Sequence, residues 1–142
     1  MSEAGKREGG CLCGAIRYRL TGEPVAVTVC HCGDCQRQSG SAFGMSLVVR
    51  REQLEILRGE PARYESRAAS GAGKHAFFCA RCGVRLYNSL ERMPETFNVK
   101  PGTLDDTRWL APRLHVWTSS RQPWVTVPEG VASFPKNPVR VG

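Results

Sequence analysis

Short runs of alternating or β-branched residues dominate the chain, and helical periodicity is nearly absent. Ile16, Tyr18 and Leu20 alternate with two arginines, which predicts a half-buried strand over residues 16–20. Similar patterns predict further strands over residues 25–29, 43–49, 54–56, 63–65, 74–78, 84–87, 96–99 and 114–117. Helix is expected only as a short turn after Cys35 and around residues 104–108.

Strands this short, with turn signals at close spacing, predict a mainly β domain. No internal repeat and no linker divides the chain, so residues 1–142 are expected to form a single domain with its core over about 9–127. Residues 66–73, rich in alanine, serine and glycine, are expected to form a mobile loop. Residues 128–142 contain three prolines and no strand pattern, which predicts an extended surface tail.

The amino-acid composition indicates the general class of protein. The chain has 142 residues, 41% of them hydrophobic, and a mean hydropathy of −0.33, which is ordinary for a soluble globular protein and excludes disordered and collagen-like chains. No apolar run approaches the roughly 20 residues that a membrane span needs. The N-terminal residues carry no apolar stretch of the signal-peptide kind. A cytoplasmic location, with no membrane partner, is therefore expected.

The net charge of +7 raises the question of a nucleic-acid partner. Sixteen of the 20 basic residues are arginines spread along the whole chain, and the densest patches are only Lys6-Arg7 and Arg50-Arg51. This distribution disfavours nucleic-acid binding as the main function. A solvated, arginine-rich surface is the simpler interpretation, and part of the charge could attract a small anionic substrate.

Seven cysteines in so short a chain are the most informative feature. An odd count excludes a fully paired intramolecular disulfide framework, and the cytosol disfavours structural disulfides. The cysteines fall in three clusters: Cys11-Leu-Cys13, Cys30-His-Cys32-Gly-Asp-Cys35 and Cys79-Ala-Arg-Cys82. Clustered thiolates favour zinc, which takes four ligands tetrahedrally.

Spacing leaves two divisions of the cysteines open. Cys32/Cys35 and Cys79/Cys82 could form one closed four-thiolate site, with three cysteines left over. Alternatively, the cluster at 11–13 joins the cluster at 79–82, and the cluster at 30–35 forms a separate group of three. The second division uses every cysteine. It gives one site without an open position, typical of structural zinc, and one with an exchangeable fourth position, typical of catalytic zinc.

Four segments resemble a known family. They are Gly10-Cys-Leu-Cys-Gly14, Cys30-His-Cys-Gly-Asp-Cys-Gln-Arg-Gln-Ser-Gly40, Phe78-Cys-Ala-Arg-Cys-Gly83 and His115-Val-Trp-Thr-Ser-Ser-Arg-Gln-Pro-Trp124. Together they closely resemble the glutathione-dependent formaldehyde-activating enzyme family, which also includes centromere protein V. The resemblance runs from about Gly9 to Pro138.

The resemblance implies a small zinc-binding β-tent fold of short antiparallel strands and two zinc ions per chain. Cys11, Cys13, Cys79 and Cys82 would hold a structural zinc, and Cys30, Cys32 and Cys35 a catalytic zinc. The implied reaction joins the thiol of glutathione, as co-substrate, to formaldehyde and gives S-hydroxymethylglutathione. In the reverse sense this is a carbon–sulfur lyase.

The residues themselves suit such chemistry. Three thiolates around Zn²⁺ leave a net charge of −1, and this soft site favours a thiol as the fourth ligand. Arg37 or Arg81 could help to dock the anionic glutathione. A three-ligand site also loses zinc more readily than a closed one, and its thiols could form a disulfide on oxidation. The alternative function is a non-catalytic zinc module that binds a protein or nucleic-acid partner.

The three histidines are expected to contribute less. The side chain of His31 lies between two cysteine ligands and is expected to point away from them. His75 is expected at the surface. His115 lies on a predicted strand and either lines a pocket or has a structural role. Asp34 and Gln38 are candidates for hydrogen bonding to the sulfur atoms, although turn-forming residues would look the same.

Overall fold

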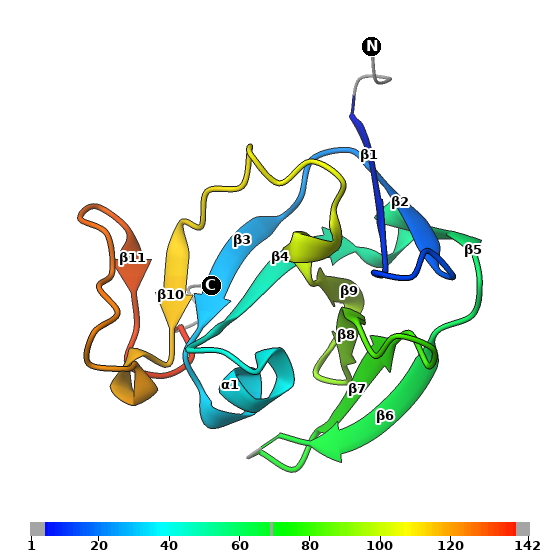
Figure 1. Cartoon of the computed structure of the whole chain (residues 1–142). Coiled ribbons are helices and arrows are strands. Elements are labelled where there is room, and N and C mark those ends of the chain that lie inside the picture. Colours follow the sequence, from blue (N-terminus) through cyan, green and yellow to red (C-terminus); the bar gives the residue numbers. More distant parts are fainter. Residues whose placement is uncertain (1–4, 69, 139–142) are drawn as a thin grey trace.

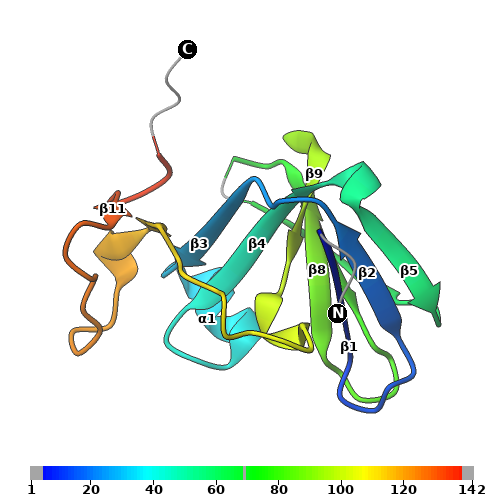
Figure 2. The ribbon, with the colours of Figure 1, turned by 90° about the horizontal axis from the view of Figure 1, so that it is seen from above.

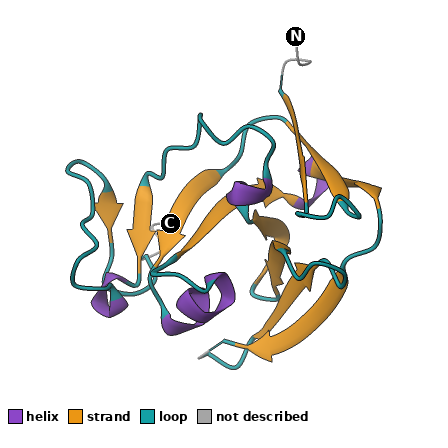
Figure 3. Cartoon of the chain, in the orientation of Figure 1, coloured by secondary structure: helices purple, strands orange, loops and turns teal. Residues whose placement is uncertain are grey.

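The computed structural model describes residues 5–68 and 70–138 and is built almost entirely of strands (Figures 1 and 3). The strands are β1 (Lys6–Gly10), β2 (Arg17–Thr21), β3 (Ala26–Cys30), β4 (Gly44–Arg50), β5 (Leu54–Arg58), β6 (Ala62–Arg67), β7 (Gly73–Phe78), β8 (Arg85–Leu90), β9 (Met93–Val99), β10 (Leu114–Val116) and β11 (Ala132–Ser133). The helical segments are α1 (Gly33–Ser39) and the short 3-10 turns η1 (Arg51–Gln53), η2 (Pro101–Thr103) and η3 (Thr118–Ser120).

The strands form two sheets (Figure 2). One has three antiparallel strands in the order β1-β2-β5, and the other has eight in the order β11-β10-β3-β4-β9-β8-β7-β6. Pairing in the larger sheet is antiparallel except where β10 lies parallel to both β3 and β11. The prediction of a mainly β fold of short antiparallel strands is confirmed.

The hydrophobic core draws on both sheets. Tyr18 of β2, Leu47 of β4, Leu86 of β8 and Val99 of β9 are each about 1% exposed and belong to one cluster of buried side chains. Tyr18 and its neighbour Leu20 alternate with exposed or half-buried positions, as the pattern along β2 predicts. Two cysteines, described below, belong to the same cluster, so the core reaches the loops that join the strands.

Strand β1 was not predicted. Its sequence, Lys-Arg-Glu-Gly-Gly, has no hydrophobic alternation. It is held by its pairing with β2 and by the ion pair of Glu8 with Arg19, whose nearest atoms are 3.1 Å apart. A Cβ atom at Gly9 would collide with the backbone oxygen of Thr103, so glycine is required there for close packing.

The predicted helix over residues 104–108 is wrong. Leu104 is buried and forms an isolated β-bridge with Gly9, and the helical turn is η2, which begins earlier at Pro101. Proline fixes the backbone torsion that a first helical position needs. The predicted turn after Cys35 is present as α1, which begins two residues before that cysteine.

The C-terminal segment after residue 128, expected to be an extended tail, contains a short strand. Residues 132–133 form β11, which pairs with β10, and the backbone N–H of Phe134 donates to the carbonyl of His115 at 3.0 Å. A two-residue strand leaves no periodic pattern to detect, and residues 139–142 lie outside the described part. The predicted loop over 66–73 is shorter, because β6 extends to Arg67 and β7 begins at Gly73. No helix among the described residues has the length and apolar character needed to cross a membrane.

Candidate metal centres

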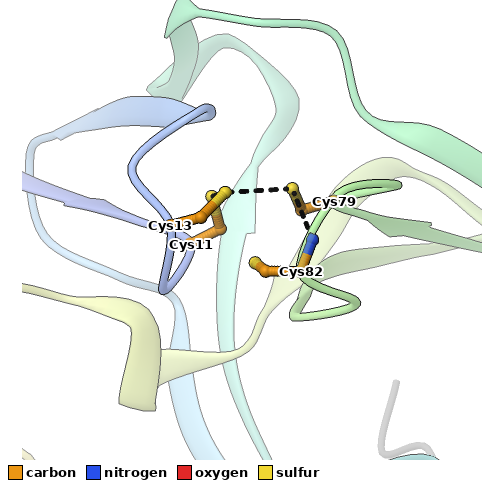
Figure 4. A group of neighbouring side chains, drawn as sticks. All are labelled: Cys11, Cys13, Cys79 and Cys82. Carbon is orange, nitrogen blue, oxygen red and sulfur yellow. Dashed lines mark hydrogen bonds between the residues drawn. The ribbon is translucent and has the colours of Figure 1, made fainter.

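Two loops from different sheets bring four cysteines together (Figure 4). Cys11 and Cys13 lie in the loop between β1 and β2, and Cys79 and Cys82 lie in the loop between β7 and β8. Their four Sγ atoms lie within 4.8 Å of one another, with 3.7 Å between Cys11 and Cys13 and 3.8 Å between Cys13 and Cys79. A tetrahedron with Zn–S bonds of about 2.3 Å has edges of roughly 3.8 Å. This four-cysteine group therefore has the spacing of a closed zinc site.

Glycines and backbone N–H groups shape both loops. Gly14 and Gly83 follow the second cysteine of each pair, and both have a φ of 81°, a left-handed conformation that favours glycine. The backbone N–H of Ile16 donates to Cys11 Sγ at 3.3 Å, and that of Cys82 donates to Cys79 Sγ at 3.4 Å. Such bonds favour the thiolate form that a metal needs.

The other three cysteines meet where β3 passes into α1. Cys30 ends β3, Cys32 is the N-cap of α1 and Cys35 lies in its first turn. Their Sγ atoms lie within 4.8 Å of one another, and all three residues are half-buried. A Cβ atom at Gly44 of β4 would be 3.1 Å from Cys35 Cβ, so this glycine lets the helix approach the sheet closely. None of the seven cysteines, all of which lie in the described residues, forms a disulfide.

Hydrogen bonding singles out one sulfur of this three-cysteine group. Hydrogen bonds from Cys30 and Cys35 lower the pKa of the Cys32 thiol, and the backbone N–H of Cys35 donates to the same sulfur at 3.3 Å. The hydrogen bond with Cys32 in turn raises the pKa of Cys30. The hydrogen bonds that Cys32 receives therefore favour its thiolate form.

Lys100, which follows β9, brings a positive charge to the three-cysteine group. Burial lowers the pKa of its ammonium group, whereas the negative charges of Cys35 and Cys30 raise it. Its Nζ donates to the carbonyl oxygen of Met45 at 3.4 Å. Lys100 was not predicted to belong to the site, because an isolated lysine at a strand end has no spacing signature. A half-buried cation here offsets the charge that thiolates concentrate.

His31 and His115 pair beside the three-cysteine group. His31 is 0% exposed, and its Nε2 lies 2.9 Å from Nδ1 of His115 on β10. Burial lowers the pKa of both rings. The His31 side chain thus turns toward β10 instead of joining the sulfur atoms, and His115 is buried against it. His75 is half-buried, with its Nε2 3.3 Å from Glu91, and so is less exposed than expected.

A cavity of about 310 Å³ lies between α1 and the larger sheet, and none of the three cysteines lines it. One wall is α1, through Asp34, Arg37 and Gln38, and the other consists of side chains from β6, β7 and β8. Asp34 and Gln38 therefore face this cavity, where each bonds to a side chain of the sheet. Of the two arginines considered for docking an anion, Arg37 lines the cavity, whereas Arg81 lies in the loop of the four-cysteine group.

The chain is similar to known proteins over most of its length. A family model described as "Glutathione-dependent formaldehyde-activating enzyme" matches residues 6–120. A protein of Halomonas elongata named "Putative glutathione-dependent formaldehyde-activating enzyme" is 25% identical over 125 residues, which cover 84% of this chain and 80% of the relative. A protein of the same name from Colletotrichum graminicola is 26% identical over 120 residues, and the match covers 75% of this chain and 61% of the relative.

A solved structure has the same fold. The crystal structure of a Rhodobacter sphaeroides protein superposes with a TM-score of 0.57 at 22% sequence identity, covering 75% of this chain and 92% of that one. At this identity the likeness concerns the fold alone.

Proposed function

The chain belongs to the glutathione-dependent formaldehyde-activating enzyme family, and we propose on this basis that it is a zinc-dependent carbon–sulfur lyase. Its reaction would form or cleave the S-hydroxymethyl adduct of glutathione, or of a similar thiol, with formaldehyde or another small aldehyde. A cytoplasmic location fits this proposal, because a reducing compartment keeps cysteines available as metal ligands and disfavours disulfides.

The observation that carries the proposal is the unequal grouping of the cysteines. Cys11, Cys13, Cys79 and Cys82 form a closed set of four sulfur atoms, part of which is buried in the core. Cys30, Cys32 and Cys35 form a set of three that is half-buried. Four protein ligands are typical of structural zinc, and three with an open position are typical of catalytic zinc.

The donor atoms fit zinc in kind and in spacing. Every donor is a cysteine sulfur, a soft ligand that zinc accepts, and the sulfur atoms stand at separations a tetrahedral ion can span. When bound by the three-cysteine group, zinc would supply a soft Lewis acid able to hold a thiol in its thiolate form at neutral pH.

The proposed reaction is the addition of a thiol to an aldehyde, with no net gain or loss of protons. A bond forms between the thiol sulfur and the aldehyde carbon, the π electrons of the carbonyl move to oxygen, and the proton lost by the thiol ends on that oxygen. The lyase direction reverses each of these changes. Residues of the chain position the sulfur ligands and offset their charge. The backbone N–H of Cys35 donates a hydrogen bond to Cys32 Sγ, and the ammonium group of Lys100 offsets the negative charge of the thiolates.

Two measurements test the proposal. Metal analysis of the purified protein is expected to give two zinc ions per chain, and the Cys32→Ser variant is expected to retain one. A glutathione-dependent loss of formaldehyde should exceed the spontaneous rate in the wild type and fall to that rate in Cys32→Ser. Two zinc ions without any rate above the spontaneous reaction would refute the activity and leave a non-catalytic zinc module. Fewer than about one zinc per chain would refute both.

A further inference from the structure

A glutamine side chain links the three-cysteine group to the segment that follows β10. Gln36 lies directly after Cys35 on α1 and is half-buried. Its side-chain Nε2 donates to the carbonyl oxygen of His31 at 2.8 Å and to that of Ser120 at 3.1 Å. Its Oε1 accepts a hydrogen bond from Nε2 of Gln122 at 2.9 Å. The amide of Gln36 therefore uses both of its N–H groups and its oxygen.

The surroundings fix the orientation of this amide. Two backbone carbonyl oxygens lie against the same end of the Gln36 side chain, and only its NH₂ end can satisfy both of them. With the amide reversed, its oxygen would face two other oxygens without a hydrogen to donate. The side chain thus has one favourable orientation, and in that orientation it holds the carbonyl of His31 in a single position.

The carbonyl that this amide binds lies between two of the cysteines. His31 stands between Cys30 and Cys32, and its backbone N–H donates to the carbonyl of Val116 on β10 at 3.0 Å. Its side chain also contacts β10, through the pair with His115 described above. The strand therefore fixes the N–H side of His31, and the glutamine amide fixes its carbonyl side, which leads directly into Cys32.

The same bond ties together the parts of the chain that carry the sulfur atoms. Cys35 and Gln36 are consecutive residues of α1, so the bond from Gln36 to His31 joins the helical turn that carries Cys35 to the peptide that leads into Cys32. Helix α1 has only seven residues, and isolated helices of this length are unstable in water. The helix therefore depends on contacts such as those of Gln36 to keep the three sulfur atoms within reach of one ion.

The segment that the glutamine contacts is itself held in place. Trp117 has a φ of 58°, the one positive value for a non-glycine residue in the part of the chain that the structure describes. A bulky residue adopts this left-handed conformation only where other contacts offset its cost. The backbone N–H of Trp117 donates to the carbonyl of Lys136 at 3.1 Å, and its Nε1 donates to Asn137 Oδ1 at 2.9 Å. The C-terminal segment thus holds the turn that presents the carbonyl of Ser120 to the glutamine.

We propose that Gln36 is a positioning residue for the three-cysteine group: its amide, anchored on the segment after β10, holds the three sulfur atoms in the arrangement that binds one metal ion. This inference rests on the proposed function, because it takes that group as the second zinc site. In this role Gln36 acts through the carbonyl of His31 and is not itself a ligand. Loss of its hydrogen bonds should loosen the metal site without removing any sulfur, and the four-cysteine group, which lies in other loops, should keep its metal.

The Gln36→Met variant tests this inference, because methionine has a similar length and no N–H group. The zinc-loaded full chain is mixed with an excess of a chromophoric chelator, and the release of both metal ions is followed over time. The phase that is missing in Cys32→Ser identifies the three-cysteine group. We expect Gln36→Met to release that metal about tenfold faster than the wild type and to release the other at an unchanged rate, which also shows that the variant is folded.

Gln38→Met is the matched control. Gln38 is a half-buried glutamine of the same helix, but it accepts its hydrogen bond from Asn88 on β8 and so contacts the other side of the larger sheet's order. We expect its release rate to change less than about twofold. Cobalt in place of zinc gives a second readout, because the visible bands of Co²⁺ depend on the geometry of its ligands. After subtraction of the spectrum of the same protein carrying Cys32→Ser, these bands should weaken in Gln36→Met and stay unchanged in Gln38→Met.

The possible outcomes separate the positioning role from the proposed activity. A wild-type release rate and cobalt spectrum in Gln36→Met, or equal changes in Gln38→Met, would overturn the positioning role even in a protein that consumes formaldehyde. A faster release and a weakened spectrum in a protein without formaldehyde activity would support the role and refute only the lyase. If Gln36→Met does not fold, Gln122→Met, which removes only the bond to Gln36 Oε1, should still speed the release about threefold, and an unchanged rate would overturn the inference.

Discussion

Replacing Cys13 by serine is expected to destabilise the domain far more than replacing Cys32 by serine. Each variant removes one thiol from one group, and neither side chain is fully buried. The four-cysteine group joins two loops that are far apart in the sequence, since Cys13 and Cys79 are separated by 66 residues. The three-cysteine group lies entirely within residues 30–35. Only the first group therefore restricts the unfolded chain over a long loop.

The difference follows from loop closure. A metal that bridges two segments limits the unfolded chain as a covalent cross-link does, and the chain-entropy relation gives about 4 kcal/mol for a loop of that length. The same relation gives about 2 kcal/mol for the short loop between Cys30 and Cys35. Because a domain of this size is stable by about 5–15 kcal/mol, loss of the longer cross-link would remove between about a quarter and most of the stability of Cys13→Ser.

Urea unfolding followed by tryptophan fluorescence, in excess zinc, measures both free energies. A strong chelator, added in place of the excess zinc, should lower the wild-type free energy of unfolding by about 6 kcal/mol and that of Cys13→Ser by only about 2 kcal/mol, because the variant retains metal in the three-cysteine group alone. Cys79→Ser should cost about 1–3 kcal/mol more than Cys13→Ser, because Cys79 is 1% exposed and a serine hydroxyl would be buried there. Equal losses in Cys13→Ser and Cys32→Ser, or a wild-type midpoint unmoved by the chelator, would refute this reasoning.

Three further predictions concern single contacts. Lys100→Gln should speed the release of metal from the three-cysteine group to a chelator about tenfold, because the offsetting cation is lost; an unchanged release rate would contradict this. Tyr18→Phe should lower the free energy of unfolding in urea by about 1 kcal/mol, since the Tyr18 hydroxyl is bonded to Thr103 Oγ1 at 2.7 Å, and an unchanged midpoint would argue against that bond. The hydrogen bond from Arg17 lowers the pKa of the Asp105 carboxyl below its usual 3.8, so its stabilisation is present above that pH and is lost as the pH falls further. The contact should cost the wild type less than about 1 kcal/mol of its free energy of unfolding between pH 5 and 2, and Asp105→Asn should not show this loss. If the variant loses stability over this range as steeply as the wild type, the contact contributes nothing.

Local patterns predicted the strands that bury one face. Tyr18 and Leu20 alternate with arginines, and the strand found there has this same alternation of burial. Strand β1 has no such pattern, because its place is fixed by pairing with β2 and by a glycine that lets the backbone approach its neighbour. The helix predicted near Leu104 failed because that side chain is drawn into the core, which a local pattern cannot reveal.

The candidate site also has parts that local sequence predicted and parts that it did not. The cysteine clusters were visible because their spacings are local, but spacing alone could not decide which clusters meet. That depends on the two loops of Figure 4, which come from different sheets. The cavity was not foreseen, because Arg37 and Arg85 come from a helix and a strand far apart in the sequence. Such sites arise only from the sheet order.

The order of the eight-stranded sheet also determines which strands are at its edges, where other chains could pair with them. Its two outermost strands are β6 and β11, and unpaired outer strands can join other chains edge to edge and start aggregation. On β6 the exposed side chains include Arg63, Glu65 and Arg67, whose charges resist stacking against an identical strand. Strand β11 has only two residues, and Pro135 follows soon after it and cannot donate a backbone hydrogen bond. Within residues 5–68 and 70–138, neither end of this sheet thus presents a long, flat, apolar strand for self-association.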